Sequence, residues 1–585
     1  MPKSFAQAVI SFRLDLLLLA IMVIAVLVRF WGIGFGMPHD GVRPDEAHIV
    51  ELALSFGSGD LNPKDFVYPS FPMYLLFGFY ILYFVFGWFI GRDISPTDFA
   101  LRYHLDPTHF FIISRSISAL LGVATVYITY RVATQLFHNK KIGVIAAFFL
   151  AVAYLHARDS HFGTVDVPLT FWIMWAMLYI SRISSEKALK NYLIVGFLAG
   201  LATATKYIGL LLVFPLVFSH LSHFFGKHDG ILHGLVDRRL VVFLIVLILT
   251  FLILTPYSVL DFPTFSADIL RNARNLTESW AGIDVGRGWF YHLRFSLWYG
   301  LGWSLFVVSL IGMVLLFIKN LRRAWILFSF PLVYYLLVGL ALTAFVRYAI
   351  PLVPFLCMAA AWFVVGISER FLSGVNTSVR GSIMLAMAVM IALPSILTLV
   401  RFDRLLIERD NRLIAADWME LNLGDHTSFY QTRGFLYTVQ LPPTVESLER
   451  LHRFLSPSRS RRGVVLSEVA RKQIEYFKRE DIIGYDEWIF DEERKRFVAG
   501  GEETEALPDY IVTQISHLPY GKVSETMKTI IEQHYVLIQS FVVSKVDNSR
   551  NLYDLQDSFY VPYFGFDGVV RPGPNIYIYQ KVSES

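Results

Sequence analysis

Long apolar runs separated by short polar stretches dominate the first 400 residues of the chain. The first predicted membrane span covers about residues 14–33. Further apolar runs cover about 70–91, 109–137, 142–157, 164–183, 191–205, 207–222, 240–258, 291–318, 324–342, 345–367 and 381–400. Since about 20 apolar residues cross a bilayer as a helix, this pattern predicts a polytopic helical membrane protein. The short runs at 191–205 and 207–222 predict a tight hairpin around Lys206.

The pattern changes at about residue 401, where charged residues become frequent and no run is long enough to span a bilayer. Helical patterns are predicted at Asp410–Met419, at 467–478 and at 521–534, and short strands at Arg462–Leu466, Tyr510–Thr513 and Tyr535–Val543. We therefore expect a mainly α protein. A transmembrane helical bundle in 1–400 precedes a soluble α/β domain in 401–585.

Basic residues in the loops predict the orientation of the spans. The clusters are Lys140-Lys141; Arg182, Lys187 and Lys190; Lys227, Arg238 and Arg239; Lys319, Arg322 and Arg323; and Arg370 with Arg380. The positive-inside rule makes these loops and the N-terminus cytoplasmic. One of the two apolar runs between the first loop and Lys140 must then not cross the bilayer. We expect the Pro-flanked run 70–91 to be a juxtamembrane or re-entrant helix. About eleven spans remain, with the loop 34–69 and residues 401–585 on the non-cytoplasmic face.

Composition supports this class and excludes others. The chain is 55% hydrophobic and only 17% charged, which a soluble globular domain rarely is. Its net charge of +4 gives no indication of nucleic-acid binding. The single cysteine, Cys357, excludes an intrachain disulfide. The first apolar run lacks a small-residue cleavage site and predicts a retained signal anchor.

The polar segment 39–51 directly after the first span carries candidate catalytic acids. Pro44 fits the first turn of a helix, and Asp45 and Glu46 then lie where the helix dipole favours negative charge. Asp45 and His48 are three residues apart and share a helix face. The segment is therefore either a catalytic acid pair at the membrane–water boundary or an interfacial helix with a solvated acidic end.

Four more ionisable residues lie at predicted non-cytoplasmic ends of apolar runs, where burying a charged side chain costs free energy and therefore suggests a function. Asp166 begins a span. In a functional interpretation it faces the first-loop acids and Arg158 balances their charge. In a structural interpretation Asp166 is a helix N-cap and Arg158 lies at a helix end. Lys206 contacts a phosphate or snorkels to the interface. Arg347 binds phosphate with its fork of donors or anchors the interface with Tyr348. Acids and cations on one face suit a reaction on a lipid phosphate.

These motifs, in this order, resemble a known family. They are Pro44-Asp45-Glu46 followed by Tyr68-Pro69; His156, Arg158 and Asp166; Thr205-Lys206; Arg347-Tyr348 with Pro351 and Pro354; Asp410-Asn411-Arg412; and the closing segment from Tyr563 to Tyr579. The chain resembles membrane glycosyltransferases of the C superfamily. Specifically, it is similar to glycosyltransferase family 39, the protein O-mannosyltransferase and aminoarabinose transferase group. The closing segment is similar to that of bacterial members, which implies a bacterial plasma membrane.

The resemblance implies a polyprenyl-phosphate sugar as donor and a lipid, glycan or protein hydroxyl as acceptor, on the non-cytoplasmic face. It implies a hexosyl or pentosyl transferase in which Asp45 is the general base, Glu46 supports the site and Asp166 is the second acid. The implied donor-phosphate ligands are Arg347, Lys206 and Arg158. We add Tyr348, Tyr68 and His48 as candidate substrate-binding residues. A lone carboxylate opposite the leaving phosphate predicts a single inverting displacement.

Two alternatives remain open at this point. Asp45, His48 and Asp166 are candidate ligands of a divalent metal, although no cofactor is firmly implied. A transporter, flippase or non-catalytic binding protein for lipid-linked sugars would use the same phosphate-binding cations. Such a protein has no need of an acidic pair beside the phosphate, and the inverted repeats that would favour a transporter are not evident in the sequence.

Overall fold

The computed structural model describes residues 3–222, 234–432, 439–458, 460–519, 521–545 and 548–582. The chain forms two compact units. Unit 1 comprises Met1–Ile33, Asn62–Leu75 and Ser114–Asp403, and unit 2 comprises Gly34–Leu61, Leu76–Ile113 and Arg404–Ser585. Unit 2 therefore joins the first loop to the residues that follow the last apolar run.

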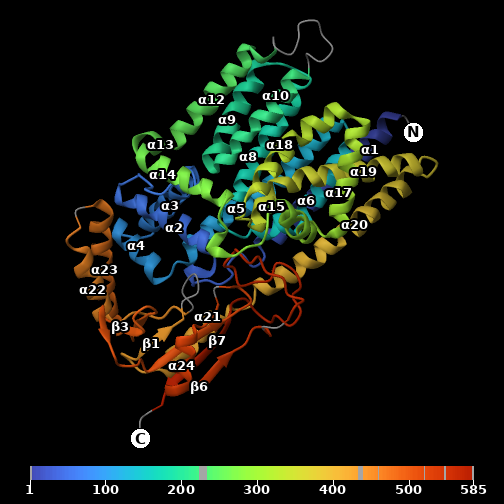
Figure 1. Cartoon of the computed structure of the whole chain (residues 1–585). Coiled ribbons are helices and arrows are strands. Elements are labelled where there is room, and N and C mark those ends of the chain that lie inside the picture. Colours follow the sequence, from blue (N-terminus) through green and yellow to red (C-terminus); the bar gives the residue numbers. More distant parts are fainter. Residues whose placement is uncertain are drawn as a thin grey trace. The chain divides into compact units, whose positions relative to one another are not determined.

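Unit 1 is helical (Figure 1). Its first elements are α1 (Lys3–Phe30), α5 (Thr108–Phe137), α6 (Lys140–Val152), α7 (Tyr154–Asp159), α8 (Asp166–Ile183), α9 (Leu189–Thr205), η3 (Tyr207–Leu212), α10 (Val213–Leu221) and α12 (Arg238–Leu254). There follow α13 (Tyr257–Leu260), α14 (Phe262–Ala273), η4 (Arg274–Leu276), η5 (Trp280–Gly282), α15 (Gly288–Tyr291), η6 (His292–Leu297), α16 (Trp298–Leu301), α17 (Trp303–Lys319), α18 (Leu321–Leu340), η7 (Val346–Leu352), α19 (Val353–Phe371) and α20 (Thr377–Leu406).

Small residues bring these helices close together. Helix α9 packs between α8 and α12. A Cβ added at Gly200 of α9 would lie 2.5 Å from Cβ of Thr250, and one at Gly196 would lie 2.8 Å from the carbonyl oxygen of Phe243, both on α12. Such close approach is how helices gain packing contacts where the surroundings are as apolar as their side chains. Glycine at these two positions therefore sets the spacing of α9 and α12.

Among the residues that the structure describes, five helices are long and apolar enough to cross a bilayer: α3 (Phe71–Phe89), α5, α18, Val346–Phe371 and Thr377–Asn422. The pair Gly288–Leu301 and Trp303–Lys319, bent by 114°, would make a sixth. The predicted count of eleven is not confirmed. Some predicted spans are short helices, such as α6 with 13 residues and α9 with 17. Helix α3 has the length of a span, so only loop charge argues that it does not cross.

The hairpin around Lys206 is tight, as predicted. Helix α9 ends at Thr205, Lys206 is extended, and η3 begins at Tyr207. A Cβ on Gly209 would lie 2.4 Å from the backbone carbon of Ala202, so η3 folds directly back onto the end of α9. Only glycine fits this turn.

Several loops with predicted cytoplasmic positions meet at one end of unit 1. The contacts are Lys140 with Asp15 (3.3 Å), Lys141 with Glu369 (3.2 Å), Arg322 with the carbonyl oxygen of Ser184 (2.5 Å) and Arg322 with Ser222 (3.3 Å). These loops were assigned to one face from charge alone. Their direct contacts support that shared face.

In the described part of unit 2, seven strands form one sheet in the order β4-β3-β2-β1-β5-β7-β6 (Figure 1). They are β1 (Ser428–Gln431), β2 (Asp486–Asp491), β3 (Arg496–Ala499), β4 (Glu502–Thr504), β5 (Tyr510–Ile515), β6 (Tyr535–Phe541) and β7 (Asn575–Lys581). Strand β1 is parallel to β2 and β5, with Tyr430 opposite Trp488 and Ile511. The other pairings are antiparallel.

Helices cover both faces of this sheet. The helical elements of unit 2 are η1 (Asp40–Val42), α2 (Pro44–Ser55), η2 (Phe56–Ser58), α3, α4 (Pro96–Leu105), α21 (Asn411–Asn422), α22 (Val445–Leu455), α23 (Arg461–Glu480) and α24 (Glu525–His534). Met419 of α21 belongs to the same core cluster as Val512, whereas Met527 of α24 belongs to that of Ile511. Neighbouring strand residues point to opposite faces, so the two clusters lie on the two sides of the sheet. The α/β expectation is confirmed.

The strand predicted at Arg462–Leu466 is wrong. These residues lie in the first turns of α23. The β-branched pair Val464-Val465 favoured a strand, but Ser460 caps a helix by accepting a hydrogen bond from the amide of Gly463 (3.0 Å). The strands predicted from Tyr510 and Tyr535 are confirmed as β5 and β6.

Candidate functional site

Asp166 and Lys206 form an ion pair inside unit 1. Asp166 begins α8 and is 1% exposed, and Lys206 occupies the extended link between α9 and η3. The Nζ of Lys206 lies 2.7 Å from Oδ1 of Asp166. Pro168 occupies the first turn of α8, where its missing N–H costs nothing. The break after α9 is thus what carries the Lys206 ammonium to the start of α8.

Arg347 joins this pair from η7. Its Nε lies 3.9 Å from Oδ2 of Asp166, and its side chain is almost fully buried. The guanidinium lies 3.9 Å from the ring centroid of Phe345, and Nζ of Lys206 lies 4.4 Å from that of Tyr348. The phenol of Tyr334 donates to the carbonyl oxygen of Tyr348 (2.8 Å), which holds η7 in place. Two cations therefore share one buried carboxylate.

The segment around Tyr68 is held beside this cluster. The hydroxyl of Tyr207, the residue after Lys206, donates to the carbonyl oxygen of Phe66 (2.9 Å). From α14, Asn272 donates to the carbonyl oxygen of Val67 (3.1 Å). Tyr68 follows directly and is half-buried. The second half of the first loop is thus fixed to the hairpin that carries Lys206.

Arg158 is buried and pairs with Asp159, its neighbour in the chain. Its Nη1 is 2.8 Å from Oδ2 of Asp159, and its guanidinium faces the ring of Phe162. Two residues earlier, Nδ1 of His156 lies 3.1 Å from Nη2 of Arg29 on α1. These contacts give Arg158 a part in packing α7, and its role as a phosphate ligand stays a proposal.

The acids of the first loop belong to unit 2. Helix α2 begins at Pro44 with Asp45 and Glu46 in its first turn, as the sequence indicates. Glu46 is buried, whereas Asp45 and His48 are half-buried. Asp45 and Asp166 lie in different units, so their expected meeting across a cavity stays a prediction.

Sequence reasoning missed the contact that holds the start of α2. Arg43 is buried and donates to Asp557 at 2.5 Å, and its guanidinium lies 5.2 Å from the ring of Phe559. Asp557 lies in an irregular segment with neither helical nor strand period, so no pattern indicated its partner. The residue before Pro44 is thus tied to the C-terminal segment.

Two motifs that the resemblance singled out lie together in unit 2. Asn411 donates to the carbonyl oxygen of Pro574 (2.7 Å), and its amide donates to that of Pro572 (2.9 Å). A Cβ on Gly573, whose φ is +107°, would lie 2.9 Å from Oδ1 of Asp410. Burial raises the pKa of Asp410, but the charge and hydrogen bonds of Arg412 outweigh it and lower the pKa below its usual value. These motifs fix the C-terminal segment onto α21.

A metal site gains no support from the described residues of either unit. Within them, no group of three or more His, Cys, Asp or Glu residues is arranged to hold a metal ion. The alternative ligand set of Asp45, His48 and Asp166 remains a hypothesis from the sequence.

Residues 112–258 match the family model described as dolichyl-phosphate-mannose-protein mannosyltransferase. The family resemblance is confirmed for these residues. They make up about a quarter of the chain and include Arg158, Asp166 and Lys206, but neither Asp45 nor Arg347. No curated protein sequence matches the chain.

Three solved structures illustrate the structural similarity. The archaeal oligosaccharyltransferase AglB from Archaeoglobus fulgidus, in complex with an inhibitory peptide and a dolichol-phosphate, is 12% identical, with a TM-score of 0.48 over 98% of this chain and 89% of that one. ArnT from Cupriavidus metallidurans bound to undecaprenyl phosphate is 13% identical, with a TM-score of 0.44 over 97% of this chain and 98% of that one. The S. cerevisiae protein O-mannosyltransferase Pmt1-Pmt2 complex bound to the sugar donor is 20% identical, with a TM-score of 0.33 over 43% of this chain and 34% of that one. Since all three TM-scores are below 0.5, we transfer no residue role from them.

Proposed function

We propose that this chain is a membrane glycosyltransferase that moves a sugar from a polyprenyl-phosphate donor to an acceptor hydroxyl. The observation that carries the proposal is the cluster of Asp166, Lys206 and Arg347, two cations around one buried carboxylate. Cations in a buried site suit a phosphate, and guanidinium groups bind phosphate oxygens with a fork of donors. The matched family, described by a dolichyl-phosphate sugar, supports the same donor chemistry.

The residues at the two ends of α8 support transfer on the non-cytoplasmic face. Asp166 begins this helix, and Arg182, a member of a basic cluster, lies 16 residues later in its last turn. At 1.5 Å per residue the two lie about 24 Å apart along the axis, at opposite ends of the helix. Since basic loops are expected to be cytoplasmic, we propose that the Asp166 cluster and residues 401–585 lie on the non-cytoplasmic face, with the N-terminus in the cytoplasm.

Donor cleavage needs stabilisation of two opposite charges. The sugar carbon becomes oxocarbenium-like as its bond to the phosphate oxygen breaks, and negative charge grows on the leaving phosphate. Arg347 and Lys206 take up that charge in a site with little water, where they act more strongly than in bulk solvent. Asp166 holds both cations in position. Since they are in place before reaction, they stabilise the transition state more than the bound donor.

Asp45 completes the reaction as general base. Its carboxylate accepts the proton of the acceptor hydroxyl while the oxygen attacks the sugar carbon from the side opposite the phosphate. One bond forms as the other breaks, so the sugar carbon inverts. Glu46 supports the first turn of α2. The substrates are contacted by Tyr68, Tyr348 and His48. Arg158 is a further phosphate ligand. The acceptor is a lipid, glycan or protein hydroxyl, and the sugar is a hexose or pentose.

Replacing Asp45 tests this mechanism directly. Asp45→Asn should lower the rate of transfer by about a hundred- to ten-thousandfold, the usual contribution of a general base, without unfolding the protein. Purified protein is given dolichyl phosphate mannose with labelled mannose, and sugar release and transfer are both counted. Asp40→Asn in the same loop is the control and should remain active. Full activity of Asp45→Asn would remove Asp45 from the mechanism.

A further inference from the structure

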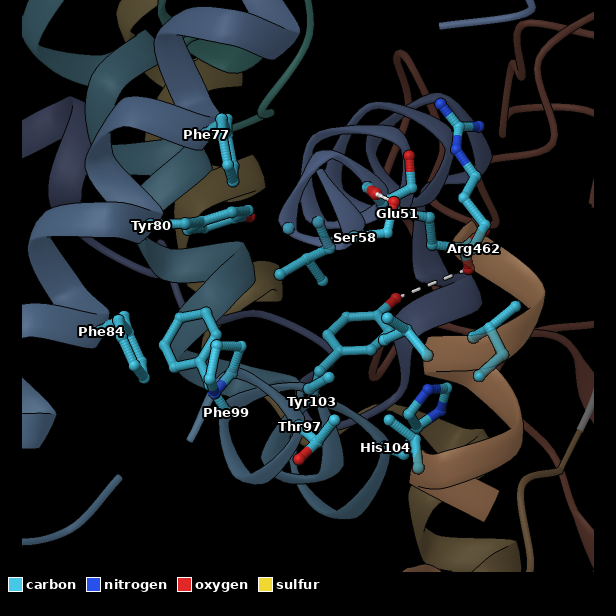
Figure 2. Close-up of a pocket in the computed structure, with 18 of the residues that line it drawn as sticks. Glu51, Ser58, Phe77, Tyr80, Phe84, Thr97, Phe99, Tyr103, His104 and Arg462 are labelled. Atoms are coloured by element: carbon cyan, nitrogen blue, oxygen red, sulfur yellow. Dashed lines mark hydrogen bonds between the residues drawn. The ribbon is translucent and has the colours of Figure 1, made fainter. Parts of the chain in front are cut away.

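A cavity of about 580 Å³ is lined by residues of unit 2 alone (Figure 2), whereas Asp166 belongs to unit 1. Its walls come from the end of α2, η2, α3, α4 and the first turns of α23. Figure 2 shows Phe77, Tyr80 and Phe84 of α3 on one side, with Glu51 and Arg462 across from them. Cavities of this size hold small molecules in many proteins.

Most of the wall is apolar. Leu54, Phe77, Ile81, Phe84, Phe99 and Val469 contribute aliphatic and aromatic side chains from four helices. A water-filled space of this kind is unfavourable, because apolar surface is more stable against another apolar surface than against water. The wall therefore suits a hydrocarbon ligand.

The surroundings of α3 indicate where such a ligand comes from. Much of the helix surface is exposed and apolar, including Leu82, Phe86 and Trp88, and α3 is among the helices long enough to cross a bilayer. Ile81 lines the cavity and is itself 46% exposed. The cavity wall thus continues into a surface that needs lipid around it, and the bilayer is the natural source of its ligand.

The polar end of the cavity is acidic. Tyr103 donates a long hydrogen bond to Oε1 of Glu51 (3.5 Å). Desolvation raises the pKa of Glu51, and the nearby charge of Asp40 raises it further. Arg462 is balanced by Asp60, whose carboxylate lies 3.7 Å from its Nε. A phosphate or other anionic group would be repelled here, whereas a hydroxyl or an ammonium would find an acceptor.

Helix α23 is fixed in place as one wall of the cavity. Near its middle, Lys472 contacts Asp98 at 2.6 Å, close to the start of α4. At its start, Arg461 donates to the carbonyl oxygen of Gly59 (2.9 Å). Two separate contacts thus hold α23 against η2 and α4.

We propose that this cavity binds the hydrocarbon chain of a membrane lipid whose head is uncharged or cationic, with the head beside Glu51 and Tyr103. The chain lies along the aromatic side chains of α3 and α4. The acidic end excludes phosphate-headed lipids, polyprenyl phosphates included. The site does not depend on the proposed transfer reaction and stands or falls by binding alone.

Two glycines provide a matched pair of variants. Gly57 lines the cavity, and a Cβ added there would meet no atom within 4 Å. Gly57→Phe therefore adds a ring at the cavity wall, and its Cβ meets no neighbouring atom. Gly78 of α3 has equally open space but lies outside the cavity wall, so Gly78→Phe adds the same ring elsewhere.

The probe is a monoacylglycerol with a diazirine in its acyl chain, added to the full-length protein in phosphatidylcholine nanodiscs. We expect labelled peptides from the cavity wall and competition by monooleoylglycerol. Gly57→Phe should lower labelling by about tenfold, as expected for overfilling a site, and Gly78→Phe should leave it unchanged. Gel filtration and thermal unfolding check that both variants fold. Equal labelling of Gly57→Phe and wild type, or labelling of the outer surface of α3 alone, would overturn the proposal.

A second arm tests the chemistry of the head. Oleyl phosphate and dolichyl phosphate should compete with the probe more weakly than monooleoylglycerol does. Glu51→Gln should reduce the preference by about two- to fivefold, the size expected for one partly solvated charge. Equal competition by the phosphate lipids in the wild type would show that the cavity takes anionic lipids and would contradict the proposal.

Discussion

The two ends of unit 1 both carry charged side chains, but in different surroundings. At the basic end, Lys140 and Asp15 are 42% and 54% exposed. At the other end, Lys206 and Asp166 are 18% and 1% exposed, with Arg347 beside them. Exposed pairs contribute about 0–1 kcal/mol. Buried pairs cost desolvation free energy, so their presence needs a function or a strict structural role. Burial, more than charge, therefore distinguishes the Asp166 cluster from the exposed charged residues at the basic end.

The largest expected difference between the ends concerns catalysis. Arg347→Ala removes a buried donor to the leaving phosphate and should lower the transfer rate by about a hundred- to a thousandfold. Arg323→Ala, from the basic end, should keep the rate within about twofold, as expected for a surface change. Release of labelled mannose from dolichyl phosphate mannose measures both. Equal losses in the two variants would erase the distinction between the ends.

Stability should separate the ends as well. Asp166→Ala leaves Lys206 and Arg347 without their shared carboxylate and should destabilise unit 1 by about 3 kcal/mol. Asp15→Ala breaks only an exposed contact and should change stability by about 0.5 kcal/mol or less. The midpoint of thermal unfolding in detergent measures both variants. A smaller loss for Asp166→Ala than for Asp15→Ala would contradict the structural part of the comparison.

A pair of intermediate exposure in unit 2 gives the smallest effect. Burial raises the pKa of Asp98, but hydrogen bonds from Lys472 and Ser95 outweigh it and hold the pKa below its usual 3.8. The pair therefore adds stability above that value and loses it as pH falls through the folded pKa. Lys472→Met should cost about 0.5 kcal/mol from pH 5 to 8, and the difference from wild type should shrink below about pH 4. A difference that grows on acidification would have the wrong sign.

Residue type and position along the sequence were enough to predict part of the candidate site. Lys206 and Arg347 stood out because charge is costly at the ends of apolar runs, and the structure brings both to Asp166. The helix at Asp410–Met419 and the strand from Tyr510 followed from the period of their apolar residues. Features that depend on residue type and local period were therefore predictable.

Long-range partners were not predictable in this way. Asp557, which binds Arg43, lies more than 500 residues away in a segment without period, so no local pattern pairs them. The helix from Arg461 carries the β-branched residues Val464 and Val465 in its first turns, and the cap from Ser460 that starts it lies outside the stretch predicted as a strand. The cavity beside Glu51 combines four separate segments, and only the folded chain brings them together.

The meeting of Asp45 with the Arg347 cluster is the central claim, and cysteine crosslinking measures it directly. With Cys357 replaced by Ala, the variant Asp45→Cys/Arg347→Cys is treated with a short bifunctional maleimide. Arg43→Cys/Asp557→Cys, whose wild-type side chains are in contact, is the positive control. The account predicts a crosslink in both variants, and addition of undecaprenyl phosphate should slow the first. A crosslink in the control without one between positions 45 and 347 would contradict the account.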